Sequence, residues 1–437
     1  MTGFDIGVAM FAGVIVMMVL RVPVAIAMLT AGALGYAAIL GWWPLLNQLK
    51  TLTFSRYSSY TLSIIPLFLL MGELATRSGM SQRLYAAARA FLGHRQGGLA
   101  MATVGGCAAF GALCGSSIAT AATMSQVAGP EMRRQGYSGA LATGTLAGGG
   151  TLGILIPPSV ILVIYAIYTE QSIGALFVAA IIPGLMAIGM YLAVIAIYAR
   201  VTPGSAPASS RLPWPERLRA LRDVWPMVLV FLLVMGGIYR GWFSPTEAAG
   251  IGVVAMGLVA VVVGGLRLRD FGRALLGTAA TSAMIFLILL GAEVFSSALA
   301  LSRMPILLSQ RIAGLDLAPL VIVALILLAY LILGCVLDAL AMVLLTMPIV
   351  FPVVLALDLG MTQVQIAIWF GILVLKAVEI GMITPPFGLN LFVINSMMPG
   401  VSMRETYVGV VGFCLADILR LVIIVLFPGV ALWLTGI

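Results

Sequence analysis

Oxygen-bearing side chains cluster in a glycine-rich stretch of an otherwise apolar region. The stretch GALCGSSIATAATM, residues 111–124, holds Ser116, Ser117 and Thr120. Hard cations prefer hydroxyl, carboxylate and carbonyl oxygens, so these residue types could form a cation site. Hydroxyls in membrane helices also bond back to their own backbone, and for any single side chain this structural role is the commoner one.

A second such stretch, GCVLDALAMVLLTMPIVFP at residues 334–352, carries a carboxylate. Asp338 has no basic residue within ten positions of it. A charged group in an apolar segment is costly unless it is paired or functional. Asp338 is therefore a stronger candidate for ion binding than any one hydroxyl.

Two proline pairs interrupt apolar segments in the same way. Pro157 and Pro158, and again Pro385 and Pro386, each follow a glycine by the spacing Gly-x-x-x-Pro-Pro. Because proline lacks an N–H, the first proline of each pair should stop a helix, and the second should occupy the first turn of the next helix. Paired prolines can also merely kink a long helix. The repetition favours a site, at which carbonyls before the break face a cation and N–H groups after it face an anion.

The composition indicates the elements that must position these residues. Of 437 residues, 62% are hydrophobic and 9% are charged, with a mean hydropathy of +1.16, whereas soluble domains carry about 25% charged residues. The pattern lacks the alternation of a β-barrel, so the sequence predicts an all-α polytopic membrane protein.

The first segment is expected to be a retained span, since no basic region precedes it. About ten crossings are expected, near residues 4–20, 22–40, 61–77, 140–169, 175–199, 225–239, 246–265, 275–300, 363–396 and 405–434.

Segments that are not simple spans complete the expected topology. Residues 98–128 and 318–353 are expected to be re-entrant helical hairpins, because irregular backbone at membrane depth must be buried or line a cavity. Segments 41–60, 78–95 and 302–315 are expected to be interfacial helices. Most of the 23 basic residues fall on one side if the N-terminus is outside, which supports that orientation.

The two halves of the chain have the same order of elements. Residues 1–199 and 223–437 each contain three spans, a hairpin, a broken span (about 140–169 and 363–396) and a closing span, and residues 200–222 form a cytoplasmic linker. An odd number of crossings per half inverts the second half relative to the first. Two inverted-topology repeats with discontinuous helices are the architecture of secondary transporters.

Other functional classes are less well supported. The single histidine, His94, is expected to be a surface residue, and the 15 acidic residues are scattered, so no catalytic constellation is evident and no enzyme activity or cofactor is expected. An ion channel would need a continuous polar pore.

Two pairs of intramembrane charges are spaced as salt pairs on their own helices, Lys376 with Glu379 and Asp417 with Arg420, although a proton path is the alternative. The cysteines are expected to be packing residues, and no nucleic acid is expected as a partner.

Five motifs resemble the large membrane subunit of the tripartite ATP-independent periplasmic (TRAP) transporters, in the ion transporter superfamily. The resemblance covers essentially the whole chain in order. It is carried by GxxCGSSxATAATM at 111–124, GGTLGILIPPS at 149–159, SPTEAAGIG at 244–252, GxxLDxxAxxLLTxPIxxP at 334–352 and IGMITPPxGxNLF at 380–392. In the third motif, Ser244, Pro245 and Glu247 also form the S-x-x-E capping box of a helix that begins near residue 246.

The resemblance implies a function, partners and site residues. It implies an elevator-type importer in the bacterial inner membrane that is driven by a sodium gradient. The importer would be paired with a small four-helix membrane subunit. A soluble periplasmic binding protein would deliver the substrate, an organic acid such as a dicarboxylate or sialic acid. A tricarboxylate-type tripartite importer and a self-sufficient sodium/carboxylate symporter are the alternatives. The implied sodium-site candidates are Ser116, Thr120, Gly150, Thr151, Asp338, Gly381 and Thr384. The implied substrate-site candidates are Ser117, Pro158, Ser159, Pro386 and Asn390.

Overall fold

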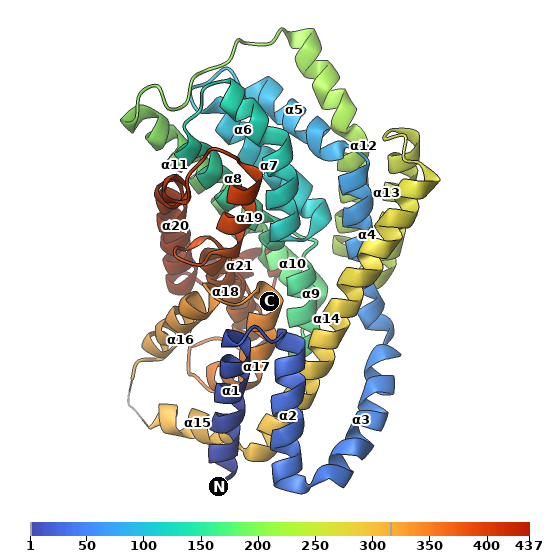
Figure 1. Cartoon of the computed structure of the whole chain (residues 1–437), viewed down its shortest axis with the longest axis vertical. Coiled ribbons are helices and arrows are strands. Elements are labelled where there is room, and N and C mark those ends of the chain that lie inside the picture. The colour runs from blue at the N-terminus through green and yellow to red at the C-terminus, as the bar shows by residue number, and fades with distance from the viewer. Residues whose placement is uncertain (1, 315–316) are drawn as a thin grey trace.

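Helices make up every regular element in residues 2–314 and 317–437, the part of the chain that the computed structural model describes. Their order is shown in Figure 1. The helices are α1 Gly3–Val19, α2 Val24–Leu40, α3 Trp42–Tyr57, η1 Tyr60–Ser63, α4 Ile64–Arg77, α5 Met80–Leu92, α6 Gly98–Cys114, α7 Ser117–Arg134, α8 Gly139–Leu155, α9 Val160–Thr169, α10 Ile173–Ala179, α11 Ile181–Val201, α12 Trp214–Tyr239, α13 Pro245–Val262, α14 Leu268–Ser302, α15 Met304–Ala313, α16 Pro319–Gly334, α17 Ala339–Leu355, α18 Gln363–Ile383, α19 Leu389–Met397, α20 Met403–Leu426, α21 Gly429–Leu432 and η2 Trp433–Thr435.

Many of these helices have the length and apolarity of membrane spans. In the described residues six helices meet both criteria, and eight spans result if the bent pairs α3 with η1–α4 and α8 with α9 count as one each. Helices α1 and α2, with 17 residues each, lie at the lower limit of about 17 residues for a spanning helix. With α1 and α2 counted as spans the total is ten; α6 and α17 have the same length but lie in the segments expected to be hairpins.

Both proline pairs lie at helix breaks, as predicted, but the second proline of each pair is not where we expected it. Helix α8 ends at Leu155 and α9 begins at Val160, bent by 40°; α18 ends at Ile383 and α19 begins at Leu389. The prediction that Pro158 and Pro386 occupy the first helical turn is therefore wrong. Ser159 and Gly388 are the N-cap residues instead, because a serine oxygen or a glycine suits that position better than a second proline does.

Each segment expected to be a re-entrant hairpin contains two helices that contact each other, α6 with α7 and α16 with α17. The first pair turns at Gly115, whose φ of +63° is a left-handed conformation that favours glycine. Ser116 then caps α7 by accepting a hydrogen bond from the Ala119 amide. The second pair turns just before Asp338, which caps α17 in the same way. Each polar residue singled out in the sequence thus begins the second helix of its pair.

Close packing of each helix pair against a broken helix depends on glycine. A Cβ on Gly111 of α6 would lie 2.5 Å from the Cα of Gly153 in α8, and a Cβ on Gly381 of α18 would lie 2.6 Å from the Cα of Gly334 in α16. Backbones that approach this closely leave no room for a side chain, which is the usual role of small residues between membrane helices. The first pair therefore packs against α8, and the second packs against α18.

Several expected boundaries shift. The span predicted at 175–199 is longer in the structure, because α10 and α11 together form one apolar span, Ile173–Val201. The predicted linker 200–222 is helical from Trp214 onward, where α12 begins. Helices α3, α5 and α15 occupy the three segments expected at the interface; the last of these segments, 302–315, ends at a residue outside the described part of the chain.

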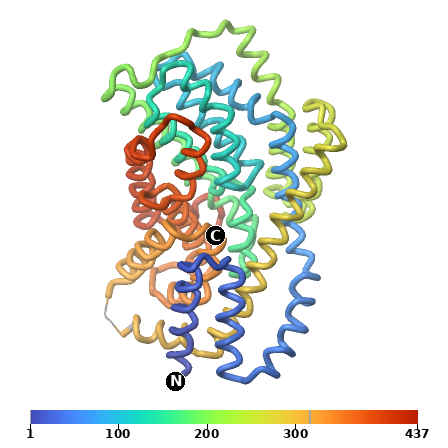
Figure 2. Tube along the Cα trace, viewed as in Figure 1, coloured from blue at the N-terminus to red at the C-terminus, as the bar shows by residue number. Residues whose placement is uncertain are grey.

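The long helix α14 runs obliquely through the molecule (Figures 1 and 2), and it contacts α1, α2, α4 and α17. Helices α4, α12 and α13 lie side by side at one edge of the view, with α4 packed against α13 and α12 packed against α13. Helices α6, α7 and α8 pack together, and α20 packs against α8. Helix α19, which follows the second break, packs against α7 and α8. The second broken helix therefore meets the first helix pair.

Candidate functional site

Two of the predicted substrate-site residues, from opposite halves of the chain, contact each other. The Asn390 side chain donates a hydrogen bond from Nδ2 to Oγ of Ser117, at 2.6 Å. Asn390 is in the first turn of α19 and is fully buried, and Ser117 is the first residue of α7 and is 2% exposed. Oδ1 of Asn390 is buried and has no hydrogen-bond partner among the described residues. This leaves a free oxygen acceptor at the contact.

A second free oxygen lies one turn along α7. Thr120 is fully buried and its Oγ1 has no hydrogen-bond partner in the described part of the chain. A Cβ placed on Gly153 of α8 would lie 2.5 Å from Thr120 Oγ1 and 2.8 Å from the Ser116 carbonyl oxygen. Both oxygens therefore face the same glycine at the end of α8. Sodium prefers such oxygen ligands, so these residues fit the ion that the sequence predicts.

The other two sodium candidates on α8 face different directions. Gly150 faces α7, since a Cβ there would lie 2.7 Å from the Cβ of Ala121. The Thr151 hydroxyl donates to the Gly148 carbonyl at 2.8 Å and lies 3.3 Å from the Tyr191 hydroxyl. The structure thus brings Gly150 to the α7 side together with Ser116 and Thr120, but the Thr151 side chain faces α11.

The three candidates of the second half have separate contacts. Asp338 Oδ1 accepts hydrogen bonds from the amides of Leu340 and Ala341, at 3.0 and 3.1 Å. Thr384 donates to the Ile380 carbonyl at 2.6 Å, and Gly381 packs on α16. No hydrogen bond in the described residues joins Asp338 to Thr384. The carboxylate therefore has a structural role as a helix cap, in addition to the ion-binding role predicted for it.

The remaining substrate candidates border the two helix breaks. Ser159 is fully buried and caps α9 by accepting from the Leu162 amide, at 3.4 Å. The Pro158 carbonyl oxygen lies 3.0 Å from the position of a Cβ on Gly115, at the turn of the first helix pair. The Pro386 carbonyl accepts from the Tyr407 hydroxyl at 2.8 Å. The first break therefore adjoins the turn between α6 and α7, and the second break is held by α20.

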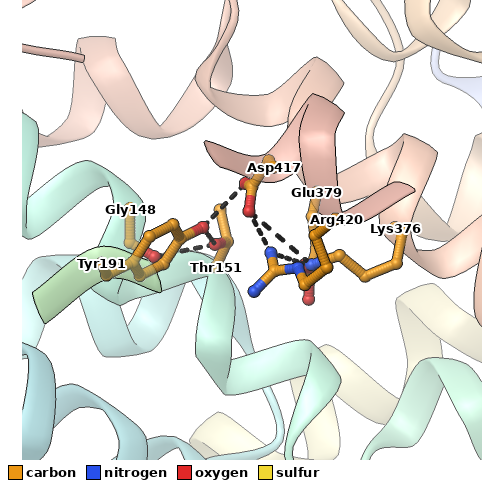
Figure 3. A network of polar contacts seen from close by, with 7 residues as sticks. All are labelled: Gly148, Thr151, Tyr191, Lys376, Glu379, Asp417 and Arg420. Atoms are coloured by element: carbon orange, nitrogen blue, oxygen red, sulfur yellow. Dashed lines mark hydrogen bonds and ion pairs between the residues drawn. The ribbon is translucent and has the colours of Figure 1, made fainter. Parts of the chain in front are cut away.

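A fully buried cluster of four charges lies beside α8 (Figure 3). Lys376 pairs with Glu379 on α18, and Asp417 pairs with Arg420 on α20, as their spacing predicts. The two helices are also joined crosswise, because Lys376 Nζ lies 3.9 Å from Asp417 Oδ1 and Arg420 Nη2 lies 3.7 Å from Glu379 Oε2. Two positive and two negative charges balance, so the cluster can persist away from water.

This charge cluster is connected to the end of α8. The Tyr191 hydroxyl of α11 donates to Asp417 Oδ2 at 2.7 Å and lies 3.3 Å from the Thr151 hydroxyl. In Figure 3, Asp417 lies between two groups of side chains: Thr151 and Tyr191 are on its left, and Arg420 is on its right. The chain of contacts holds α8, α11, α18 and α20 together. The crosswise pairs could not be predicted from the sequence, because the paired residues are about 40 positions apart in the chain.

The groups near the two breaks are mainly hydroxyl, amide and carbonyl groups. In the described residues no group of three or more histidine, cysteine, aspartate or glutamate side chains gathers as it would around a metal ion. The unpartnered groups near the breaks are the neutral oxygens of Asn390 and Thr120 and, one turn before the end of α18, the Oε1 atom of Glu379. The arrangement offers oxygen ligands of the kind that hard cations prefer, and amide N–H groups at a helix start of the kind that attract anions.

Comparison with known proteins agrees with these features. Residues 11–430 match the family described as tripartite ATP-independent periplasmic transporter, DctM component. The chain is 37% identical to the C4-dicarboxylate TRAP transporter large permease protein DctM of Pseudomonas aeruginosa, over 87% of each chain. It is 31% identical to the ectoine TRAP transporter large permease protein TeaC of Halomonas elongata, over 97% of this chain and 98% of the relative.

A solved structure shares the fold. The Alcanivorax borkumensis YdaH transporter matches with a TM-score of 0.61 and 14% sequence identity, over 93% of this chain and 97% of that one. At this identity the likeness concerns the fold alone. The family match over nearly the whole length and the identity to large permease proteins show that this chain belongs to the TRAP transporter large permease (DctM) family.

Proposed function

We propose that this chain is the transport subunit of a sodium-gradient-driven importer of small organic acids in the bacterial inner membrane. A periplasmic binding protein delivers the substrate, and a small four-helix membrane subunit completes the permease. The chain consists of two inverted repeats, residues 1–199 and 223–437, joined by the linker, and works by an elevator movement. The family membership supports the transporter class, and the contacts below support the finer statements.

Corresponding contacts in the two halves support the inverted repeat. In each half a helix pair turns into a capped second helix, at Ser116 or Asp338, and a glycine of the first helix packs against the glycine that begins the Gly-x-x-x-Pro-Pro motif. The same sequence motif thus makes the same kind of contact twice. Two elements built alike and inserted in opposite directions would face one another across the membrane midplane.

The contact between Ser117 and Asn390 is the observation that carries the proposal. It joins the first helix pair to the helix after the second break, so a single ligand can bridge the two halves. The nearby free oxygens, Asn390 Oδ1 and Thr120 Oγ1, are buried acceptors with no donor among the described residues. A buried unsatisfied oxygen is costly, and a sodium ion would remove that cost.

Helix α19 is suited to the carboxylate of the substrate. Its N-cap is Gly388, which provides no side-chain hydrogen bond to the first-turn amides. Free N–H groups at a helix start attract an anion. The C4-dicarboxylate relative and the ectoine relative are named for substrates that both carry a carboxylate. A small carboxylate beside Asn390, with sodium beside Thr120, is the arrangement that we propose.

Uptake by reconstituted protein tests the proposal. The chain is reconstituted with its small membrane subunit, and succinate uptake is measured with an inward sodium gradient, with and without an added binding protein. Thr120→Val keeps the side-chain shape and removes the free oxygen, so the sodium concentration for half-maximal uptake should rise by about tenfold or more. Thr103→Val is the matched control, because that buried hydroxyl donates to the Leu99 carbonyl on its own helix.

The substrate contact has its own variant. Asn390→Ala should abolish uptake, whereas Ser396→Ala on the same helix should not, because Ser396 is exposed and donates to the Val393 carbonyl. Uptake that does not depend on sodium would remove the ion from the proposal. Robust uptake without a binding protein would identify a self-sufficient symporter.

A further inference from the structure

Arg217, in the first turn of α12, is a buried cation that forms no ion pair with any residue that the structure describes. Its residue exposure is 4%, and its Nε and Nη2 atoms have no hydrogen-bond partner in the described part of the chain. The guanidinium carbon lies 5.3 Å from the ring centre of Trp214 and 6.0 Å from that of Phe91. The aromatic rings contact the guanidinium, but its N–H groups remain free to donate.

The aromatic contacts do not account for this burial. A cation over an aromatic ring gains about 0.5–2 kcal/mol, whereas a buried charge without a partner costs several kcal/mol. The first turn of a helix is also its positive end, which disfavours a cation there. The acids Glu216 and Asp223 of the same helix line a different groove, beside Arg219 and Arg83. An anion beside Arg217 would satisfy the free N–H groups and offset the charge.

Other unpartnered groups lie in the same region. His94 Nδ1 and Ser209 Oγ are buried and have no hydrogen-bond partner among the described residues. The linker holds them together, because the Ser209 amide donates to the Gly93 carbonyl at 2.9 Å and the Gly97 amide donates to the Ala206 carbonyl at 3.1 Å. The linker therefore packs on the turn between α5 and α6.

The charges that shift the pKa of His94 are all positive. Its pKa lies below the usual value, first because the ring is partly desolvated and then because the cations of Arg217, Arg211 and Arg95 are close. No acid contributes to this shift. The region thus combines cations with unpartnered polar side chains, and no anionic side chain is among the groups that shift the pKa of His94.

We propose that Arg217, His94 and Ser209 form a binding site for a phosphate group, of an anionic lipid headgroup or of a free phosphate. A guanidinium held against aromatic rings presents two parallel N–H donors, which match two phosphate oxygens. Trp214 is 62% exposed at the start of a spanning helix, and tryptophan in such a place lies at headgroup depth. The arginine-rich side that includes the linker is the cytoplasmic one, so the headgroup belongs to the inner leaflet. This site is separate from the proposed transport site, and either proposal can fail alone.

The sole histidine of the chain is a direct reporter of the site. The full chain is labelled with ¹⁵N-histidine in maltoside micelles, and the pKa of His94 is measured by NMR. One arm adds inorganic phosphate, with chloride adjusted to keep ionic strength constant, and the other adds short-chain phosphatidylglycerol. A bound anion should raise the pKa of His94, by about one unit for each tenfold preference of the anion for the protonated ring.

Matched variants make the experiment decisive. Arg217→Gln should abolish the rise, and Arg219→Gln, which removes the same charge from the same helix, should leave it intact. If Arg217→Gln fails to fold, Ser209→Ala on the linker provides a second test. It should raise severalfold the concentration of phosphate or phosphatidylglycerol that produces half of the rise in the His94 pKa. A response to phosphatidylglycerol alone identifies a lipid site, and a response to both probes shows that the phosphate group is sufficient. No rise with either probe, or an equal loss in Arg219→Gln, would overturn the proposal.

Discussion

The buried charge cluster makes a quantitative prediction about stability. Replacing Asp417 with asparagine removes one negative charge from a cluster in which Lys376, Glu379 and Arg420 are all fully buried. The Tyr191 hydroxyl can still donate to the asparagine carbonyl. The site is left with an excess positive charge, and leaving a buried charge unpaired costs about 3–5 kcal/mol.

A second substitution should reverse most of that loss. Lys376 Nζ and Asp417 Oδ1 are 3.9 Å apart, which corresponds to about 4 kcal/mol of attraction at an effective dielectric constant of about 20. In the double variant Lys376→Met with Asp417→Asn, Glu379 and Arg420 remain 3.7 Å apart and the charges balance. We expect the double variant to be more stable than Asp417→Asn alone, with a coupling energy of about 3 kcal/mol.

Unfolding in mixed micelles measures this coupling. The free energy of unfolding is obtained from circular dichroism as the mole fraction of dodecyl sulfate rises, for the parent, both single variants and the double variant. Asp270→Asn is the control, because its ion pair with Arg273 is exposed and should contribute less than about 1 kcal/mol. Additive effects of the two substitutions, with a coupling below about 0.5 kcal/mol, would refute the reasoning that charge balance stabilises these helices.

Two further predictions concern helix packing and capping. Gly381→Ala should destabilise the protein by about 1–3 kcal/mol, because the new Cβ would lie 2.6 Å from the Gly334 backbone. Gly189→Ala is the control, because nothing lies within 4 Å of a Cβ at that position. It should be neutral or stabilising by up to about 1 kcal/mol in the same unfolding assay. Ser244→Ala should cost about 1 kcal/mol, because it removes the hydroxyl that accepts from the Glu247 amide at 3.3 Å, and an unchanged unfolding free energy would show that this capping box does not stabilise α13.

Local sequence features predicted much of the fold. Proline and glycine mark the ends of α8 and α18, because their effects on the backbone are local. The capping box at Ser244 was predicted correctly for the same reason. The span predicted at 175–199 was also found, since α10 and α11 together form one apolar span across Ala180.

Contacts between distant segments were not predictable in the same way. The sequence indicated Ser117 and Asn390 separately, and only the packing of α19 on α7 brings them together. The direction of the Thr151 side chain depends on the angle at which α8 meets α11, which no local pattern records. The pairing of Lys376 with Asp417 likewise requires two helices to meet at one register.

Helix α14 is much longer than a lipid bilayer is thick. Its 35 residues extend over about 52 Å at a rise of about 1.5 Å per residue, compared with about 30 Å of hydrocarbon. Such a rod must lean or project from the lipid, and a thicker or thinner membrane changes how far it leans. Since α14 contacts α2, α4 and α17, a change in its tilt would also shift the helices that pack against it. Lipids of different acyl-chain length should therefore change the transport rate without changing the contacts of any bound ligand.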